Sequence, residues 1–140
     1  MRTVRDESGT LYLLLAESDE SSRVRDPETG TERYLPNDRL EPVEGESPLA
    51  TAARAVPESV RTVASAVNDD RSLGLLVHLD ANGPIAVRTL LSSTDLCESD
   101  LLGLLTEFRA AGLVAETTVA GEGGYETTDL ASEGLARLRG

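Results

Sequence analysis

The N-terminal third of the chain alternates short apolar runs with turn-forming residues. In "LYLLLA" (11–16) the apolar residues are consecutive, which predicts a strand that is covered on both of its faces. Turn chemistry occurs at residues 7–9 and again at 26–30, where a proline presets φ and a glycine accepts a positive φ. The pattern predicts two β-hairpins, the second of which pairs residues 23–25 with residues 33–35.

A helical pattern replaces the strands from residue 47 onwards. Serine precedes proline at 47–48, and proline precedes glutamate at 57–58. Both pairs are helix-start signals, because a proline at the first helical position lacks only an N–H group that would be unpaired there anyway. Two helices are therefore predicted, over about 49–55 and about 58–67.

Two further helices are predicted before residue 95. The Asn-Asp-Asp sequence at 68–70 ends the preceding helix and supplies an N-cap for the next one. That next helix, over about 71–80, is apolar nearly all round, so we expect neighbouring elements to cover more than one of its sides. A Gly-Pro pair ends it, and residues 85–94 are interpreted as one further short helix.

The segment from residue 95 contains a helical period followed by a hairpin. Apolar residues fall at positions i, i+3, i+4 and i+7, namely Leu101, Leu104, Leu105 and Phe108. This spacing predicts a helix over about 98–111 with one buried face, and Gly112 ends it. Two short strands, 113–119 and 125–129, are predicted around a flexible hairpin tip at 120–124. A last helix follows, to residue 140.

These elements predict an α+β fold in three parts. Residues 1–46 form a small antiparallel β-domain, residues 47–69 a helical connector, and residues 70–140 a further domain. The order in that domain is helix, short helix, helix, hairpin and helix, which is typical of a winged helix-turn-helix. Because a β-domain this small is marginal alone, we expect it to dock on the remainder of the chain.

The segment "DLCESDLLGLLTEFRAAGLV" (95–114) resembles the turn and third helix of ArsR-, MarR- and PadR-like transcription regulators. Leu96 fills the turn, Cys97 takes the usual Ser or Thr cap position, and residues 112–114 lead into the wing. Looser similarity to the strand-to-helix ending of these regulators lies at Tyr125, Thr127, Thr128 and Gly134. The resemblance covers residues 70–140 and implies a regulator of transcription that binds double-stranded DNA. The whole chain also resembles a haloarchaeal family in which a small β-domain precedes a winged helix.

The composition adds a strong acidic bias to this picture. Asp and Glu number 25 against 13 basic residues, all of them Arg, and the formal net charge is −12. A chain of 140 residues without lysine is improbable at average amino-acid usage. Carboxylate-rich, lysine-free surfaces keep proteins hydrated in concentrated salt, so we interpret the charge as adaptation to a cytoplasm rich in potassium chloride. The alternative is an ordinary acidic protein that avoids nucleic acid.

Several classes of function are not favoured by the sequence. No apolar run reaches membrane-spanning length and residues 1–8 do not resemble a signal peptide, so we expect a soluble, cytoplasmic protein without membrane contact. A single cysteine and a single histidine give no disulfide or zinc site, and no nucleophile, base and orienter form a set. We therefore expect no enzyme, metal or cofactor. Cys97 is interpreted as a helix cap and not an oxidant sensor, and His78 as a satisfied helix residue.

The resemblance assigns candidate DNA contacts by position. They are the exposed face of the third helix, with two residues of the helix before it: Glu98, Ser99, Asp100, Leu102, Gly103 and Thr106, then Arg88 and Thr89. The third-helix residues include no Arg, Lys, Asn or Gln, the side chains that usually distinguish base edges. At molar salt the Debye length falls to about 3 Å, so binding would depend on short contacts and on cations that bridge carboxylates to phosphates.

Two other interpretations of the third helix stay open. Exposed Leu102 beside Gly103 suits a protein-interaction module as well as a DNA reader. Leu102 could also pack beneath a neighbouring helix. Separately, helices 49–55 and 58–67 each carry an apolar stripe larger than a small wing needs. We therefore predict a two-fold homodimer through these helices or the last one.

Overall fold

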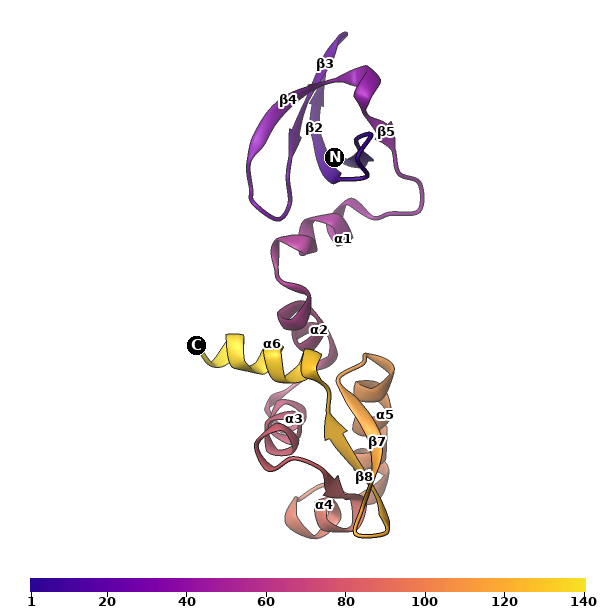
Figure 1. The fold of residues 1–140 in the computed structure, drawn as a ribbon, viewed down its shortest axis with the longest axis vertical. Coiled ribbons are helices and arrows are strands. Elements are labelled where there is room, and N and C mark those ends of the chain that lie inside the picture. Colours follow the sequence, from indigo (N-terminus) through magenta and orange to yellow (C-terminus); the bar gives the residue numbers. More distant parts are fainter. The chain divides into compact units, whose positions relative to one another are not determined.

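The computed structural model describes residues 1–140 as two units, Met1–Pro57 and Glu58–Gly140 (Figure 1). The boundary falls between Pro57 and Glu58, so the segment 47–69, treated above as one connector, is divided between the units. Its first helix packs on strands of the N-terminal unit, whereas its second packs against the last helix of the C-terminal unit. Each unit therefore completes its own core with half of that segment.

The N-terminal unit is built on one antiparallel sheet with strand order β4-β3-β2-β1-β5. Its strands are β1 (Arg2–Arg5), β2 (Leu11–Glu17), β3 (Ser21–Arg25), β4 (Glu32–Pro36) and β5 (Glu41–Pro42). The second predicted hairpin is confirmed, but residues 23–25 pair with residues 32–34, one position earlier than predicted. The difference arises at the turn, where the Asp26 N–H donates to the Thr31 carbonyl, so that β4 begins directly after Thr31.

Side chains are buried on both faces of this sheet. In β2, Tyr12, Leu13 and Leu14 are all buried, which confirms the predicted two-sided strand. Helix α1 (Pro48–Ala52) packs on β1 and β2. It is followed by the short 3-10 turn η2 (Ala53–Ala55). There the buried hydroxyl groups of Thr3 and Thr51 lie 2.7 Å apart in a hydrogen bond. The 3-10 turn η1 (Asn37–Arg39) links β4 to β5.

The C-terminal unit has the winged helix-turn-helix order, which confirms the predicted α+β fold class. Its elements are α2 (Glu58–Ala66), α3 (Asp70–Asn82), β6 (Ile85–Ala86), α4 (Val87–Ser93), α5 (Glu98–Ala110), β7 (Val114–Val119), β8 (Glu122–Thr127) and α6 (Asp129–Arg139). The three strands form an antiparallel sheet of order β6-β8-β7. The β7–β8 hairpin is the wing, and it runs beside α5 (Figure 1).

Two local predictions for this unit are wrong. Residues 85–94 are not all helical, because Ile85 and Ala86 are buried and pair with β8 as strand β6. The wing has no flexible tip over 120–124 but a two-residue turn, in which Ala120 and Gly121 have φ values of 51° and 82°. The remaining tip residues belong to β8. A Cβ on Gly124 would lie 2.5 Å from the Ile85 carbonyl oxygen, so only glycine allows β6 to pair there.

A leucine-rich core holds the helices of the C-terminal unit together. Its fully buried members include Leu76, Leu79, Leu90, Leu101, Leu105, Phe108, Leu113 and Ala131. At one edge of this core, α6 crosses α2 so closely that a Cβ on Gly134 would lie 2.3 Å from the Ser59 carbonyl oxygen. Gly134 therefore lets two helix backbones meet.

Candidate nucleic-acid interface

Helix α5 is fixed in place through one side. Leu101, Leu105 and Phe108 have no exposed surface, and Leu104 is partly buried. Leu96, in the turn before the helix, is also buried against the same core. Gly112, with φ +81°, ends the helical backbone and leads the chain into β7. The period seen in the sequence therefore determines which side of α5 turns away from the core.

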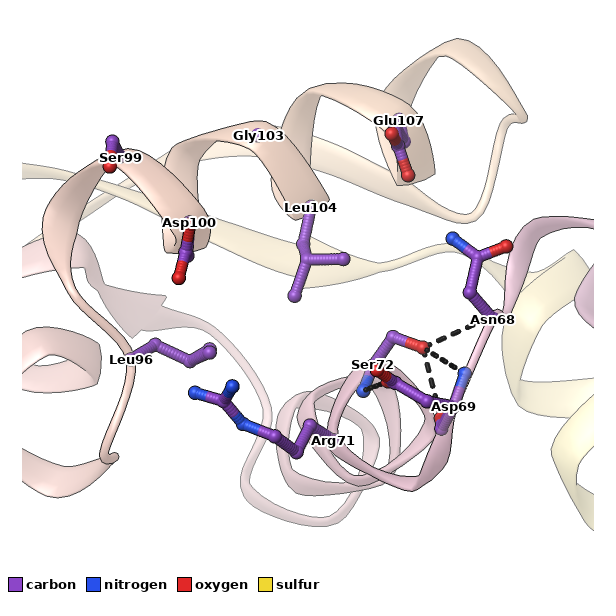
Figure 2. A pocket seen from close by; sticks show the side chains of 10 residues that line it. All are labelled: Asn68, Asp69, Arg71, Ser72, Leu96, Ser99, Asp100, Gly103, Leu104 and Glu107. Atoms are coloured by element: carbon purple, nitrogen blue, oxygen red, sulfur yellow. Dashed lines mark hydrogen bonds between the residues drawn. The ribbon is translucent and has the colours of Figure 1, made fainter.

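All eight residues assigned as candidate DNA contacts are exposed. They are Arg88 and Thr89 on α4, and Glu98, Ser99, Asp100, Leu102, Gly103 and Thr106 on α5. At 100° per residue, Ser99, Leu102, Gly103 and Thr106 fall on the side of α5 away from its buried residues, and the exposed Glu98 at the helix start borders this side next to Leu102. We call this the outward face: Glu98, Ser99, Leu102, Gly103 and Thr106. Asp100 lies on a flank instead, with its carboxylate turned towards α3 (Figure 2).

The outward face carries few groups that can donate a hydrogen bond. The Thr106 hydroxyl donates to the Leu102 carbonyl at 2.8 Å, so its proton is already used. The Ser99 hydroxyl lies 3.4 Å from Cys97 Sγ. Cys97 does occupy the N-cap position of α5, as the resemblance implies, but its side chain makes no capping hydrogen bond. Chemically, the outward face is a mixture of acceptors and small apolar groups.

The arginines around α5 are each held by a carboxylate. The pairs join α4 to the wing, α5 to the wing, and α3 to the turn before α5: Arg88 to Glu122 at 3.3 Å, Arg109 to Glu116 at 2.9 Å, and Arg71 to Asp95 at 3.8 Å. The side chains of all six residues are substantially exposed, and exposed ion pairs contribute only about 0–1 kcal/mol each. A competing anion can therefore take over a guanidinium group at small cost.

A groove of about 320 Å³ lies along the flank of α5 that faces α3. Figure 2 shows Asp100 and Leu104 directed into this groove, whereas Ser99 points away from it. The opposite wall is the start of α3, with Asp69, Arg71 and Ser72. Sequence reasoning did not identify these groove residues as part of a site, although the Asp69 to Ser72 spacing is a usable signal for a helix start.

Asp69 is bound to its own helix and not directed at a ligand. Its carboxylate accepts the backbone N–H of Ser72 at 2.8 Å, and Ser72 Oγ accepts the backbone N–H of Asp69 at 3.2 Å. The pKa of Asp69 is lowered from its ordinary value, chiefly by the hydrogen bond from the Ser72 N–H and next by the Ser72 side chain. The negative charge at this end of the groove therefore caps α3.

Carboxylates outnumber arginines throughout the C-terminal unit. Residues 58–140 contain 13 Asp and Glu against six Arg, and α5 itself carries Glu98, Asp100 and Glu107 against Arg109. A DNA-binding surface normally gains affinity from phosphate neutralisation by basic side chains. That source of affinity is weak here, so any ligand of α5 is recognised mainly by short-range contacts.

No three His, Cys, Asp or Glu side chains are grouped so that they could hold a metal ion. His78 Nδ1 lies 3.1 Å from the side-chain amide of Asn82, one turn later on α3. No helix combines the length and the apolar composition that crossing a membrane requires.

Comparisons with known proteins place the chain in a family. The crystal structure of the transcriptional regulator HlyU from Vibrio vulnificus CMCP6 is similar at 24% identity with a TM-score of 0.48, over 56% of this chain and 81% of that chain. No curated protein matches the chain. The family model described as a family of unknown function, DUF7346, matches residues 1–139. Because this match covers nearly the whole sequence, the chain belongs to the DUF7346 family.

Proposed function

We propose that this protein is a DNA-binding transcription regulator whose C-terminal unit reads the double helix with α5. The supporting observation is that the outward face of α5 is left uncovered beside the wing. An α-helix with its side chains is about 10–12 Å wide, which suits a major groove about 12 Å wide. In winged helices the corresponding helix enters that groove. The proposed contacts are the outward face, Asp100, Arg88 and Thr89.

The negative charge is compatible with this function if the protein works in concentrated potassium chloride. At molar salt the Debye length is about 3 Å, so carboxylates repel phosphates only where the groups nearly touch. We propose that cations occupy those places and bridge Glu98 and Asp100 to the DNA. Direct contacts would come from the Ser99 and Thr89 hydroxyls and from Arg88.

Arg88 has a defined role in this proposal. Its side chain is 84% exposed, and its contact at the wing, Glu122, is 45% exposed. Because such a pair is weak in water, a DNA phosphate can replace Glu122 as the partner of the guanidinium. Binding would then release the tip of the wing from α4, while Arg88 holds α4 against the DNA backbone.

A salt series tests the proposal directly. Fluorescence anisotropy with sheared genomic DNA is measured across potassium chloride concentrations from dilute to molar. Cation bridging predicts an affinity that changes little, or rises, with salt, whereas counterion release from a basic surface gives a steep fall. A steep fall would reject the bridging, and no binding at any salt would reject the DNA-binding function.

Two matched variants locate the interface. Thr106→Ala removes a side chain from the outward face and should weaken DNA binding at every salt concentration. Thr62→Ala is the control, because the Thr62 hydroxyl makes the same kind of bond to the carbonyl four residues earlier, at 2.8 Å, but on α2. Equal binding by the two variants would place the DNA elsewhere on the molecule.

A second candidate is a winged helix that binds another protein. It is favoured by Leu102, which is 37% exposed on a helix with three carboxylates, because an apolar spot within an acidic surface suits a basic partner. Leu102→Glu should abolish capture of that partner. Loss of a partner in this variant, together with no DNA binding at any salt, would decide for this candidate.

We also propose a two-fold homodimer, formed either through α1 and α2 or through α6. Leu49 in α1 is 75% exposed, Val56 is 40% exposed, and Leu138 in α6 is 52% exposed. Exposed large apolar side chains are candidates for burial between copies. Light scattering in concentrated potassium chloride should give twice the chain mass. A single 14.9 kDa species would contradict the dimer.

A further inference from the structure

The outward face of α5 has an unusual hydrogen-bonding character for a surface that meets DNA. The Glu98 carboxylate can only accept hydrogen bonds. The Thr106 hydroxyl already donates a hydrogen bond to the Leu102 carbonyl, so it has no proton left for a ligand. Ser99 is then the one side chain of this face with a hydroxyl proton that is not bonded to the backbone. A surface of this kind cannot satisfy several hydrogen-bond acceptors at once.

Neighbouring arginines do not readily supply the missing donors. Arg109 donates to Glu116 at 2.9 Å and lies in the last turn of α5, whereas recognition helices usually contact base edges with their N-terminal residues. Arg88 belongs to α4 and pairs with Glu122 at the wing, so it is placed for phosphates. Arg71 lines the groove on the flank of α5 and pairs with Asp95, so the base-facing chemistry is that of the outward face.

The same face presents apolar groups to a ligand. Leu102 is 37% exposed, and the γ-methyl of Thr106 is left for contact because its hydroxyl bonds back to the helix. Between them, Gly103 has no side chain, and the space that a Cβ would occupy there is open, with no atom within 4 Å. A small apolar group can thus approach the helix closely at this point.

Base pairs differ in how well they match such a surface. In the major groove both kinds of base pair present two acceptors and one donor: N7, O6 and the cytosine N4 amino group in G·C, and N7, O4 and the adenine N6 amino group in A·T. Only the A·T pair adds an apolar group, the thymine C5-methyl. The methyl group is therefore what distinguishes A·T from G·C on this face, and it suits Leu102 and the γ-methyl of Thr106.

We infer that α5 selects A·T-rich DNA, and that Leu102 and Thr106 recognise thymine through its methyl group. This inference rests on the proposed DNA-binding function and specifies its target. The recognition is largely apolar, so it remains effective in concentrated salt, where charge contacts are screened. It therefore matches the composition of the chain as well as the geometry of the helix.

Replacing thymine by uracil tests the inference, because uracil keeps every hydrogen-bonding group and lacks only the methyl. Three short duplexes are compared by fluorescence anisotropy at the salt concentration of tightest binding: one A·T-rich, the same sequence with uracil, and one G·C-rich. We expect affinity to fall by about fourfold for each methyl group contacted when uracil is present. The G·C-rich duplex should bind more weakly than the thymine duplex.

A variant separates recognition by Leu102 from changes in the DNA itself. Leu102→Ala should lower the thymine-to-uracil affinity ratio, while the control Tyr34→Ala, which removes an exposed side chain on β4 of the N-terminal unit, should leave the ratio unchanged. Equal affinity of the unmodified protein for thymine and uracil duplexes would overturn the inference and leave the proposed function standing, and so would tighter binding to the G·C-rich duplex. Absence of binding to all three duplexes at every salt concentration would overturn both.

Discussion

Helix α5 has one buried side and one exposed side, and the same type of residue occurs on both. Leu101 is 0% exposed within the core, whereas Leu102, one position later, is 37% exposed. Glycines show the same contrast between helices: a Cβ on Gly134 of α6 would collide with the backbone of α2, but a Cβ on Gly103 of α5 would contact nothing. Residue type alone therefore does not distinguish scaffold from candidate site in this unit.

The largest expected effect comes from the two adjacent leucines. Leu101→Ala should destabilise the protein by about 2–5 kcal/mol, because it leaves a cavity in a fully packed core. Leu102→Ala should change stability by less than about 0.5 kcal/mol, as substitutions at exposed positions usually do. Urea unfolding in concentrated potassium chloride measures both values. Similar losses for the two variants would mean that Leu102 is covered in solution.

The two glycines provide the next test. Gly134→Ala should cost about 1–3 kcal/mol, because the new methyl group would lie 2.3 Å from the Ser59 carbonyl and force α6 away from α2. Gly103→Ala should stabilise the protein by about 0.5–1 kcal/mol, since alanine is the better helix former and space is free. Thermal unfolding of both variants in parallel gives the comparison. A stable Gly134→Ala protein would show that α2 and α6 can separate without loss of stability.

Salt concentration should affect the stability of the protein through the carboxylates on its exposed sides. With a net charge of −12, dilution to low ionic strength lengthens the range of repulsion between carboxylates and should lower the melting temperature or loosen the structure. Circular dichroism across a potassium chloride series measures the change. An unchanged spectrum and melting temperature at low salt would remove support for adaptation to concentrated salt.

The smallest expected effect concerns the start of α3, at the edge of the groove. Hydrogen bonds from Ser72 lower the pKa of Asp69 in the folded protein below 3.8. The carboxylate therefore contributes stability that is present above the unfolded-state pKa and lost as pH falls through the folded-state pKa. Asp69→Asn keeps a capping oxygen but does not titrate, so its stability should depend less on pH below about 4. Identical acid unfolding profiles would contradict this contribution.

Local patterns in the sequence determined much of the fold and the side of α5 that faces outwards. The spacing of Leu101, Leu105 and Phe108 predicts the buried side of the helix, and the glycine at 112 predicts its end, because both depend on residues within a few turns of one another. The turn of the hairpin at 26–30 was likewise predicted from residues that are close in the sequence. The exposure of Ser99, Leu102, Gly103 and Thr106 follows from this period.

Other features were decided only by contacts between distant residues. Strand β6 exists because Ile85 and Ala86 meet β8, some 40 residues later, and the sequence around them is equally compatible with a helix. The division of the segment 47–69 depends on which unit each helix packs against. Pairs such as Arg88 with Glu122 join elements that local periodicity cannot relate. Periodicity shows which way a side chain faces, but its partner depends on how the chain folds back on itself.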